Sequence, residues 1–394
     1  MKPEELRIAL FSGNYNYVRD GANQALNRLV GFLLRQGANV RVYSPTVEKP
    51  AFAPTGDLVG VPSMPIPGRP EYRLALRIPL KVKRDIEAFN PNVFHVAAPD
   101  FVAHRAVTWA RKHNVPVISS VHTRFDTYLQ YYGLKFLEPG ARAIMRRYYR
   151  RCDAIVVPAE STAAIMRAQR MNKDISIWAR GVEHEQFNPG RRSLEWRRGH
   201  GIGDDEVVVC FLGRLVLEKG LDVFADAIEA ARAKGARLRV VAIGQGPARE
   251  FFQERLPDAI FTGQLTGSEL ATALASTDVF LNPSVTETFG NVTLEAMACG
   301  LPVMAAAASG TTSLVQDNIT GRLAEPGDID AMADELVEYQ RNPELRARHG
   351  AAGLEFARTM DWDHINAAVM HVYQRVIERR QRLNRRLGLE VLRP

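Results

Sequence analysis

The sequence of 394 residues predicts an α/β protein built from two doubly wound halves, each with its own parallel sheet. Short apolar runs alternate with helix-length segments, and short connections join them. This alternation is typical of right-handed βαβ units. The pattern restarts at Val207–Phe211, after a polar stretch over Asn188–Gly203. We therefore expect two halves that face each other, with a ligand cleft between them.

The first half is predicted to open with a strand over Leu6–Phe11, a helix over Ala22–Gln36 and a strand over Asn39–Tyr43. The segment Pro45–Pro70 is rich in proline, and we expect a loop there. The next expected elements are a helix over Leu80–Phe89, a strand over Val93–Val96, a helix over Ala103–His113, and strands over Val115–Ser120 and Ala154–Val157.

The second half repeats this alternation. Its predicted strands are Val207–Phe211, Arg237–Ile243, Ala259–Phe261, Val279–Asn282 and Val303–Ala306. Helices are expected between them, including Leu221–Arg232, Val292–Cys299 and Ala331–Gln340. Gly300 and Pro302 end the second of these helices, as a glycine cap followed by a proline usually does.

Composition indicates an ordinary α/β enzyme in a reducing cytoplasm. An apolar content of 46% is enough for two cores, and no apolar run is long enough to span a bilayer. The N-terminal apolar stretch is strand-sized and lacks the plan of a signal peptide. Cys152, Cys210 and Cys299 are scattered, so they suggest neither a disulfide framework nor a metal site.

The net charge is +7, which makes anionic partners plausible, and the positive charge is clustered. One cluster is Arg142, Arg146, Arg147, Arg150 and Arg151, with Tyr148 and Tyr149 among them; a second is Arg375, Arg379, Arg380, Arg382, Arg385 and Arg386; a third is Arg69, Arg73, Arg77, Lys81, Lys83 and Arg84. Each could be a solvated face. Mixtures of arginine and aromatic residues also suit contact with an anionic membrane. No recognised nucleic-acid-binding module accompanies the charge, so we expect no nucleic-acid partner.

Glu287 and Glu295 are eight positions apart after the strand-like run ending at Asn282. Glu287 falls in the loop above the carboxyl end of a strand, where open α/β sheets bind ligands. Glu295 falls inside the following helix. Two carboxylates placed in this way can hold two separate sets of hydroxyls, although a bare pair at this spacing is often only a surface acid and a helix acid.

Arg214 and Lys219 lie in the segment Gly213–Gly220, between a predicted strand and a predicted helix. A diphosphate there would meet a guanidinium, an ammonium and the positive end of a helix dipole. The turn Gly244-Gln245-Gly246-Pro247 is too short for a dinucleotide fingerprint, and no acidic residue ends the next strand, which argues against NAD.

Two candidates lie in the first half. A loop over Ser12–Gly21 runs into a helix N-terminus, where backbone N–H groups can meet an anion, although a simple tight turn is also possible. His122 lies just past a strand end, where it could contact a sugar hydroxyl or a developing charge. A structural histidine bonded to a nearby carbonyl remains the alternative.

Several motifs together resemble one family of enzymes. They are Val121-His122-Thr123-Arg124-Phe125-Asp126 with Tyr131-Tyr132-Gly133, Arg180-Gly181-Val182 with Phe187-Asn188-Pro189, Gly213-Arg214 with Glu218-Lys219-Gly220, and Glu287-Thr288-Phe289-Gly290 with Leu294-Glu295-Ala296-Met297. In this order, across nearly the whole chain, they resemble retaining glycosyltransferases of family four. The subgroup with sulfoquinovosyl-diacylglycerol synthases and lipid α-mannosyltransferases is the most similar.

The resemblance implies a GT-B fold with two Rossmann-like domains: an acceptor-side domain over 1–190, a nucleotide-sugar domain over 191–360, and a C-terminal helix with a basic tail over 361–394 that returns to the first domain. It also implies transfer of a sugar from a UDP- or GDP-sugar with retention of configuration, without a cofactor or a metal. A membrane lipid is the expected acceptor, and the expected location is the cytoplasm, peripheral to the inner face of the cytoplasmic membrane.

The resemblance also assigns roles to residues by position. Gly213, Arg214 and Lys219 would bind the diphosphate, and Glu295 the ribose. Glu287, with the backbone of Phe289, Gly290 and Asn291, would hold the donor sugar. His122 would contact that sugar, and Gly21 would let the first loop close over the phosphates.

Two segments depart from the family pattern. Ser309-Gly310-Thr311-Thr312-Ser313 replaces the usual glycine-rich turn, so we carry over no contacts there. Asp20-Gly21-Ala22-Asn23 is more polar than the corresponding run in many relatives, which leaves acceptor recognition open. Asp328-Ile329-Asp330 matches a D-x-D metal motif in letters, but it opens a helix, and we expect Asp328 to be its cap.

Three alternatives stay open. The acceptor could be a soluble molecule or a polysaccharide, the chain could be a sugar-nucleotide 2-epimerase of the same fold, or it could be a basic nucleotide- or nucleic-acid-binding protein without enzymatic activity. The base and sugar of the donor do not follow from the sequence, and neither does the identity of the acceptor.

Overall fold

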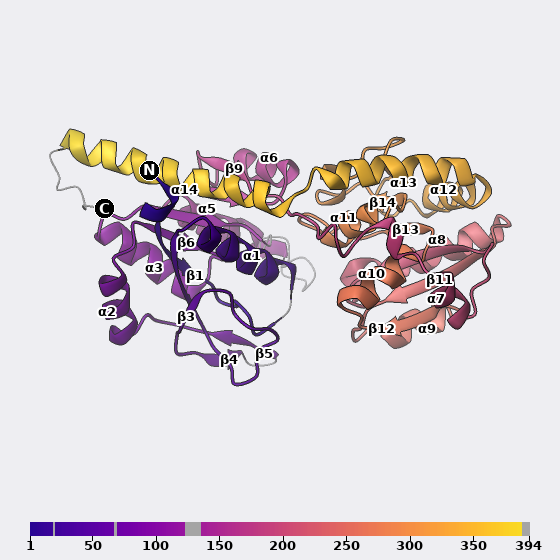
Figure 1. The fold of residues 1–394 in the computed structure, drawn as a ribbon, viewed down its shortest axis with the longest axis horizontal. Coiled ribbons are helices and arrows are strands. Elements are labelled where there is room, and N and C mark those ends of the chain that lie inside the picture. The colour runs from indigo at the N-terminus through magenta and orange to yellow at the C-terminus, as the bar shows by residue number, and fades with distance from the viewer. Residues whose placement is uncertain (19, 67–68, 123–134, 388–394) are drawn as a thin grey trace. The chain divides into compact units, whose positions relative to one another are not determined.

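The computed structural model describes residues 1–18, 20–66, 69–122 and 135–387, and the chain folds into two compact units (Figure 1). The first unit comprises Met1–Ala179 and Trp362–Pro394, and the second comprises Arg180–Asp361. The division therefore lies before Arg180 and not after residue 190. The segment that follows Arg180 is tied to the second unit, since Val182 donates its backbone N–H to the Met360 carbonyl at 3.1 Å.

The first unit is built on a parallel sheet. Its strand order among the described residues is β3-β2-β1-β6-β7-β8-β9. The strands are β1 Arg7–Phe11, β2 Asn39–Ser44, β3 Asp57–Gly60, β6 Val93–Val96, β7 Val117–Ser120, β8 Ala154–Val157 and β9 Ile175–Ile177. The α-helices in the described part of this unit are α1 Gly21–Arg35, α2 Leu80–Phe89, α3 Phe101–Lys112, α5 Glu138–Tyr149, α6 Glu160–Ala168 and α14 Trp362–Leu387.

The prediction of a loop over Pro45–Pro70 is wrong. Asp57–Gly60 forms β3 at the edge of the sheet, and β4 (Met64–Ile66) pairs antiparallel with β5 (Arg69–Leu74). An edge strand needs apolar residues on few positions and tolerates proline, so the proline-rich composition hid both features. The outer strands β9 and β15, which the sequence did not predict, are also edge strands.

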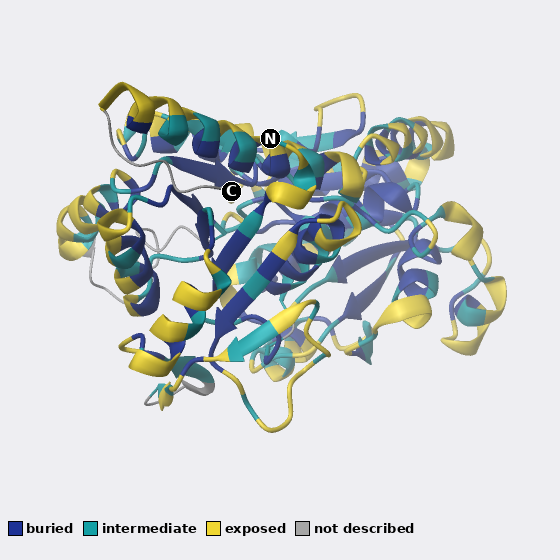
Figure 2. Cartoon of the chain, turned by 60° about the vertical axis from the view of Figure 1, so that its left-hand side comes forward, coloured by how far each residue is buried: buried dark blue, intermediate teal, exposed yellow. Residues whose placement is uncertain are grey.

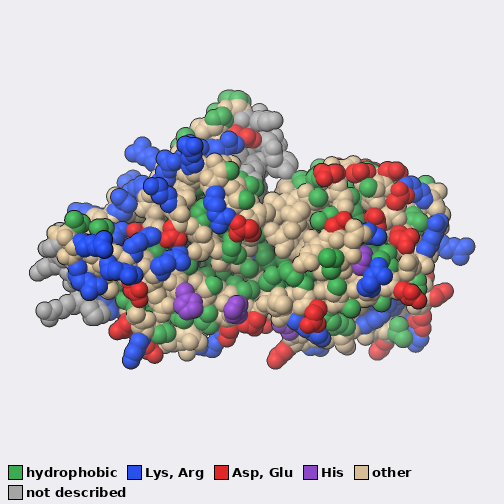
Figure 3. Space-filling view, turned by 90° about the horizontal axis from the view of Figure 1, so that it is seen from above, with side chains coloured by type: hydrophobic (Ala, Val, Ile, Leu, Met, Phe, Trp, Pro, Cys, Tyr) green, Lys and Arg blue, Asp and Glu red, His purple; other side chains and the backbone are tan. Residues whose placement is uncertain are grey.

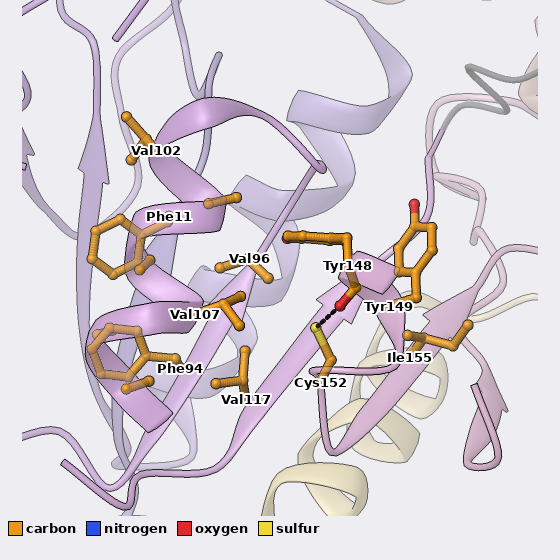
Figure 4. Packing of buried hydrophobic residues seen from close by; sticks show 14 of the residues in the cluster. Phe11, Phe94, Val96, Val102, Val107, Val117, Tyr148, Tyr149, Cys152 and Ile155 are labelled. Carbon is orange, nitrogen blue, oxygen red and sulfur yellow. Dashed lines mark hydrogen bonds between the residues drawn. The ribbon is translucent and has the colours of Figure 1, made fainter. Parts of the chain in front are cut away.

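One face of the first sheet carries an aromatic and aliphatic core (Figure 4). The rings of Phe11 and Phe94, from neighbouring strands, stack with centroids 5.4 Å apart. Cys152 lies at the edge of this core, and its Sγ donates to the Tyr148 carbonyl at 3.8 Å. Burial raises the pKa of Cys152 to about 12, so this thiol stays protonated at neutral pH. All three cysteines are free and buried, and none forms a disulfide, as their scattered positions in the sequence predicted.

The C-terminal helix α14 returns to the first unit, as predicted. Its buried residues face the sheet and its exposed residues form the outer side (Figure 2). Arg35 pairs with Asp363 at 2.5 Å, and the Trp178 indole donates to Asn366 Oδ1 at 3.2 Å. Helix α14 is thus part of the fold of the first unit and not a free tail.

The second unit repeats the architecture, with the strand order β12-β11-β10-β13-β14-β15 in the described chain. Its strands are β10 Val207–Leu212, β11 Leu238–Ile243, β12 Ile260–Gly263, β13 Val279–Asn282, β14 Val303–Ala306 and β15 Gly321–Ala324. Its helices are α7 Leu194–Gly199, α8 Leu221–Ala233, α9 Arg249–Arg255, α10 Gly267–Ala275, α11 Asn291–Ala298, α12 Ile329–Arg341 and α13 Pro343–Arg358. The predicted fold class is confirmed.

Candidate functional site

Strand order places the candidate residues of the second unit at a topological switch point. From β10, the chain runs outward through β11 and β12 on one side and through β13, β14 and β15 on the other. The loops after β10 and β13 therefore both start at the carboxyl ends of adjacent parallel strands. Such switch points are where doubly wound sheets bind their ligands. Arg214 and Lys219 lie in the first loop, and Glu287 lies in the second.

The loop after β10 is held by the loop after β11. Leu215 donates its N–H to the Gln245 carbonyl at 2.9 Å. A Cβ added at Gly244 would lie 1.9 Å from the Gly213 carbonyl oxygen, so only glycine permits this approach. The two backbones therefore fix the position of Arg214, whose side chain is exposed. No carboxylate forms an ion pair with Arg214 in the described part of the chain.

Lys219 and Glu287 contact each other directly. Lys219 Nζ donates to Glu287 Oε1 at 2.5 Å, and the two side chains are 28% and 16% exposed. Thr286 strengthens this link between the loops, because its Oγ1 donates to the Glu218 carbonyl at 3.2 Å. The sequence predicted separate roles for Lys219 and Glu287, and the structure brings the two side chains together.

The loop after β14 packs on Glu287, a contact that the sequence did not predict. Ser309 Oγ donates to the Glu287 carbonyl at 3.4 Å. A Cβ at Gly310 would lie 2.6 Å from both the Cβ and the carbonyl oxygen of Glu287. The glycine in Ser309-Gly310-Thr311 was the available signal, but it lies in the segment that departs from the family pattern.

Helix α11 begins directly after this site. Gly290 precedes it, Asn291 is its first residue, and the Phe289 side chain is buried in the interior. Asn282 Nδ2 donates to Thr293 Oγ1 at 2.9 Å, which ties the start of the helix to the end of β13. Glu295 lies one turn further on, inside the helix as predicted, and it is half-buried.

In the first unit, the loop after β1 touches the loop after β6. These two strands are neighbours, and the chain leaves them in opposite directions across the sheet. A Cβ at Gly13 would lie 2.5 Å from Asp100 Oδ2. Burial raises the pKa of Asp100 to about 6. Gly21 is the first residue of α1, after the cap Asp20, whose Oδ1 accepts the Asn23 N–H at 2.8 Å.

His122 follows β7 and is half-buried. Its Nε2 is 2.9 Å from Ser120 Oγ, and its ring lies edge-on to Trp178 with centroids 5.4 Å apart. The His122 ring is thus held in place by Ser120 and Trp178. The remainder of its motif, over 123–134, lies outside the described residues.

Asp328 caps helix α12, as predicted. Asp328 Oδ1 accepts the Ala331 N–H at 3.0 Å, and Asp330 pairs with Lys234 at 2.6 Å. Within the described ranges, no group of three or more His, Cys, Asp or Glu residues is arranged to hold a metal ion.

The basic clusters are partly structural. On α14, Arg375 and Arg379 pair with Asp174, and Arg380 pairs with Asp153, at 2.7–2.9 Å. On α5, Tyr148 and Tyr149 are buried in the core, so the expectation of surface aromatic residues there is wrong. The arginines and tyrosines are neighbours in sequence, but successive residues of a helix are turned by about 100°, so neighbours can point to different sides of the helix.

Exposed apolar side chains accompany basic residues on α2 and near the start of α5. The α5 patch consists of Phe136, Leu137, Ile144 and Arg147, and the α2 patch consists of Leu76, Arg77, Leu80, Lys83 and Arg84. The most exposed apolar members are Phe136 at 73%, Ile144 at 65% and Leu80 at 62%. Among the described helices, none is both long enough and apolar enough to cross a bilayer.

Two protein-family models match the chain: Glycosyltransferase Family 4 over residues 19–186 and Glycosyl transferases group 1 over residues 206–342. Sulfoquinovosyl transferase SQD2 of Arabidopsis thaliana is 31% identical over 92% of this chain and 73% of its own length. Alpha-monoglucosyldiacylglycerol synthase of Streptococcus pneumoniae is 23% identical over 81% of this chain and 75% of its own length.

A solved structure, sucrose-phosphate synthase from Thermosynechococcus elongatus, aligns with a TM-score of 0.78 over 95% of this chain and 100% of that one, at 20% identity. This likeness concerns the fold. Together with the matched family models and the length of the alignments, it leads to one conclusion: the chain belongs to glycosyltransferase family 4, a family of retaining hexosyltransferases with the GT-B fold.

Proposed function

We propose that the protein transfers a sugar from a nucleoside diphosphate to a membrane lipid, and that it works at the surface of an anionic membrane. The observation that carries the donor part is the Lys219–Glu287 pair at the switch point of the second unit, with Arg214 in the same loop as Lys219. It places two cations and a carboxylate at the edge of the sheet where a phosphorylated sugar would bind.

The cations would act on the leaving group. As the glycosidic bond breaks, negative charge develops on the β-phosphate oxygen. Arg214, Lys219 and the N-terminal N–H groups of α8 would stabilise this charge, which lowers the barrier directly. Glu287 orients the Lys219 ammonium through their hydrogen bond. In this proposal, the protein cations need no divalent metal to assist them.

The remaining groups would position the donor. Glu287 and the backbone at Phe289, Gly290 and Asn291 would hold the sugar, and Glu295 on α11 would hold the ribose. In the first unit, His122 would donate to the sugar, and the loop ending at Gly21 would approach the phosphates. With the leaving phosphate close to the acceptor hydroxyl, front-face attack accounts for retention without a second carboxylate.

The charge of the first unit supports an anionic membrane as the site of action. Met1–Ala179 and Trp362–Pro394 contain 33 Lys and Arg against 17 Asp and Glu, a formal +16, whereas Arg180–Asp361 contains 18 against 27, a formal −9. Figure 3 shows this difference on one face, with basic side chains gathered over the first unit at the left.

The α2 and α5 patches add apolar anchors to this charge. Basic residues draw a protein to anionic lipid, and exposed apolar side chains enter the headgroup region. One of the relatives is named alpha-monoglucosyldiacylglycerol synthase, and this name supports a lipid acceptor. The association would be peripheral and at the cytoplasmic face.

The test is nucleotide release from a panel of UDP- and GDP-sugars, with vesicles of extracted membrane lipid as acceptor and EDTA in parallel reactions. We expect one donor to release nucleotide in step with labelled glycolipid, with or without EDTA. Transfer only to a water-soluble glycan would exclude the lipid acceptor, and loss of transfer in EDTA would exclude the metal-free mechanism.

A further inference from the structure

A chain of three hydrogen bonds connects His122 to Tyr373 on the C-terminal helix α14. His122 Nε2 is 2.9 Å from Ser120 Oγ, and this oxygen is 3.0 Å from His95 Nε2. His95 Nδ1 is 2.5 Å from the Tyr373 hydroxyl. The groups come from β7, β6 and α14, and Ser120, His95 and Tyr373 are all buried.

His95, in the middle of this chain of hydrogen bonds, is neutral. His95 is fully buried, and burial lowers its pKa to about 3. A neutral imidazole carries one N–H, so one ring nitrogen of His95 donates and the other accepts. All the hydrogen bonds in the chain must therefore donate in the same direction.

Tyr373 sets the direction. Its side chain is fully buried, and within the described residues its hydroxyl has one hydrogen-bond partner, His95 Nδ1. If His95 Nδ1 carried the proton, the Tyr373 hydrogen would be buried without an acceptor, which is costly. Tyr373 therefore donates to His95 Nδ1, and His95 donates from Nε2 to Ser120 Oγ. The Ser120 hydrogen is then directed at His122 Nε2.

We propose that Tyr373, His95 and Ser120 form a one-way relay that holds His122 as the tautomer with its proton on Nδ1. These three are positioning residues. The inference rests on the proposed function for its catalytic meaning: a His122 protonated at Nδ1 would donate from that nitrogen to the donor sugar.

Trp178 keeps the two imidazoles in place. Its ring meets His95 and His122 edge-on, with centroids 6.0 Å and 5.4 Å away, and its N–H is bonded to Asn366 on α14. Helix α14 thus supplies both the first donor of the relay and the anchor of the ring beside it. This gives the returning helix a role in the reaction beyond stability.

The direct test is imidazole nitrogen NMR of the full-length protein labelled with 15N-histidine, with the His122 signals assigned by their loss in His122→Gln. In the wild type we expect His122 protonated at Nδ1. Tyr373→Phe retains the ring but removes the donor, and Ser120→Ala breaks the last link. Both should raise the population of the Nε2–H tautomer of His122.

A matched control exists in the second unit. Tyr339 is buried and its hydroxyl is 2.9 Å from His349 Nδ1, so Tyr339→Phe makes the same change at a buried tyrosine–histidine pair. It should leave the His122 tautomer unaltered. Tyr373→Phe should also lower kcat about 3–10-fold, the size of one neutral hydrogen bond, without changing KM for the donor.

The outcomes separate the relay from the proposed function. An Nε2–H tautomer of His122 in the wild type, or a tautomer that Tyr373→Phe leaves unchanged, would overturn the relay. A tautomer that changes as expected while kcat stays constant would support the relay and contradict the role of His122 in transfer.

Discussion

Lys219 and Glu287 are partners in the structure, and this couples two side chains for which the sequence predicted separate roles. Removing Lys219 leaves a partly buried carboxylate without its cation, and removing Glu287 frees the ammonium from its orientation. Such neighbours are not expected to contribute independently. The effects of substituting Lys219 and Glu287 should therefore be compared with the effect of the double substitution.

The cations of the donor site should be essential for transfer. Arg214→Ala and Lys219→Ala each remove a charge that stabilises the leaving diphosphate, which corresponds to roughly 2–4 kcal/mol in the transition state. We expect kcat to fall by roughly 30- to 900-fold in steady-state assays. Arg348→Ala, another exposed arginine of the second unit, is the control and should retain activity. Near wild-type turnover in both site variants, with intact circular dichroism, would remove the donor-site assignment.

The two glutamates should differ in what they bind. Glu295→Ala is expected to weaken binding of the free nucleoside diphosphate, because the ribose loses its acceptor. Glu287→Gln keeps the shape and removes the charge, so it should impair use of the donor sugar more than binding of the nucleotide. Isothermal titration with the nucleotide alone compares them, and equal losses of affinity would contradict separate ribose and sugar roles.

Loops after successive strands support each other through backbone contacts, and this explains why glycines surround the site. Gly244 lies against the Gly213 carbonyl, and Gly310 lies against Glu287. A side chain at either position would push apart the loops that present Arg214 and Glu287. The spacing between these loops, and not only their side chains, is part of the site.

Gly244→Ala should therefore damage both stability and transfer. A Cβ there would meet a carbonyl oxygen at 1.9 Å, and its φ of 141° also disfavours a side chain. We expect a loss of about 1–3 kcal/mol in urea unfolding, as for other overpacked positions. Gly199→Ala, a helical glycine with nothing within 4 Å of an added Cβ, is the matched control and should be neutral or slightly stabilising. Unchanged unfolding of Gly244→Ala would show that the loops can separate without cost.

Charge and exposed apolar side chains are distributed unevenly over the molecule. The first unit carries the positive excess together with the α2 and α5 patches, while the second unit carries a negative excess. A membrane-binding surface should need both components. Electrostatic attraction alone would be strongly weakened by salt, whereas inserted apolar side chains retain part of the binding.

Liposome co-sedimentation should show binding to anionic vesicles that weakens as salt rises. Replacing Lys83, Arg84 and Arg147 by alanine should cost on the order of 1 kcal/mol for each residue near the surface. Leu80→Ser with Ile144→Ser should reduce binding at every salt concentration. Ile319→Ser, at an exposed apolar residue of the second unit, is the control. Equal binding to neutral and anionic vesicles, or none at low salt, would exclude the membrane surface and favour a soluble acceptor.

The sequence by itself determined the features that depend on local pattern. Alternating apolar runs and helices predicted both parallel sheets, because their periodicity is written in neighbouring residues. The cap Asp328 and the helix that carries Glu295 follow from signals a few residues long. The strands β3, β9 and β15 were not predicted, because they are short and include polar residues or glycine, so they lack the apolar run by which a strand is recognised.

Only the tertiary structure decided which of these elements became neighbours. Strand order placed the loops after β10 and β13 side by side, which joined Lys219 to Glu287. The return of α14 joined Tyr373 to His95, which are 278 positions apart. No local pattern encodes such contacts, because they arise from packing whole elements against one another and from the requirement that buried polar groups find partners.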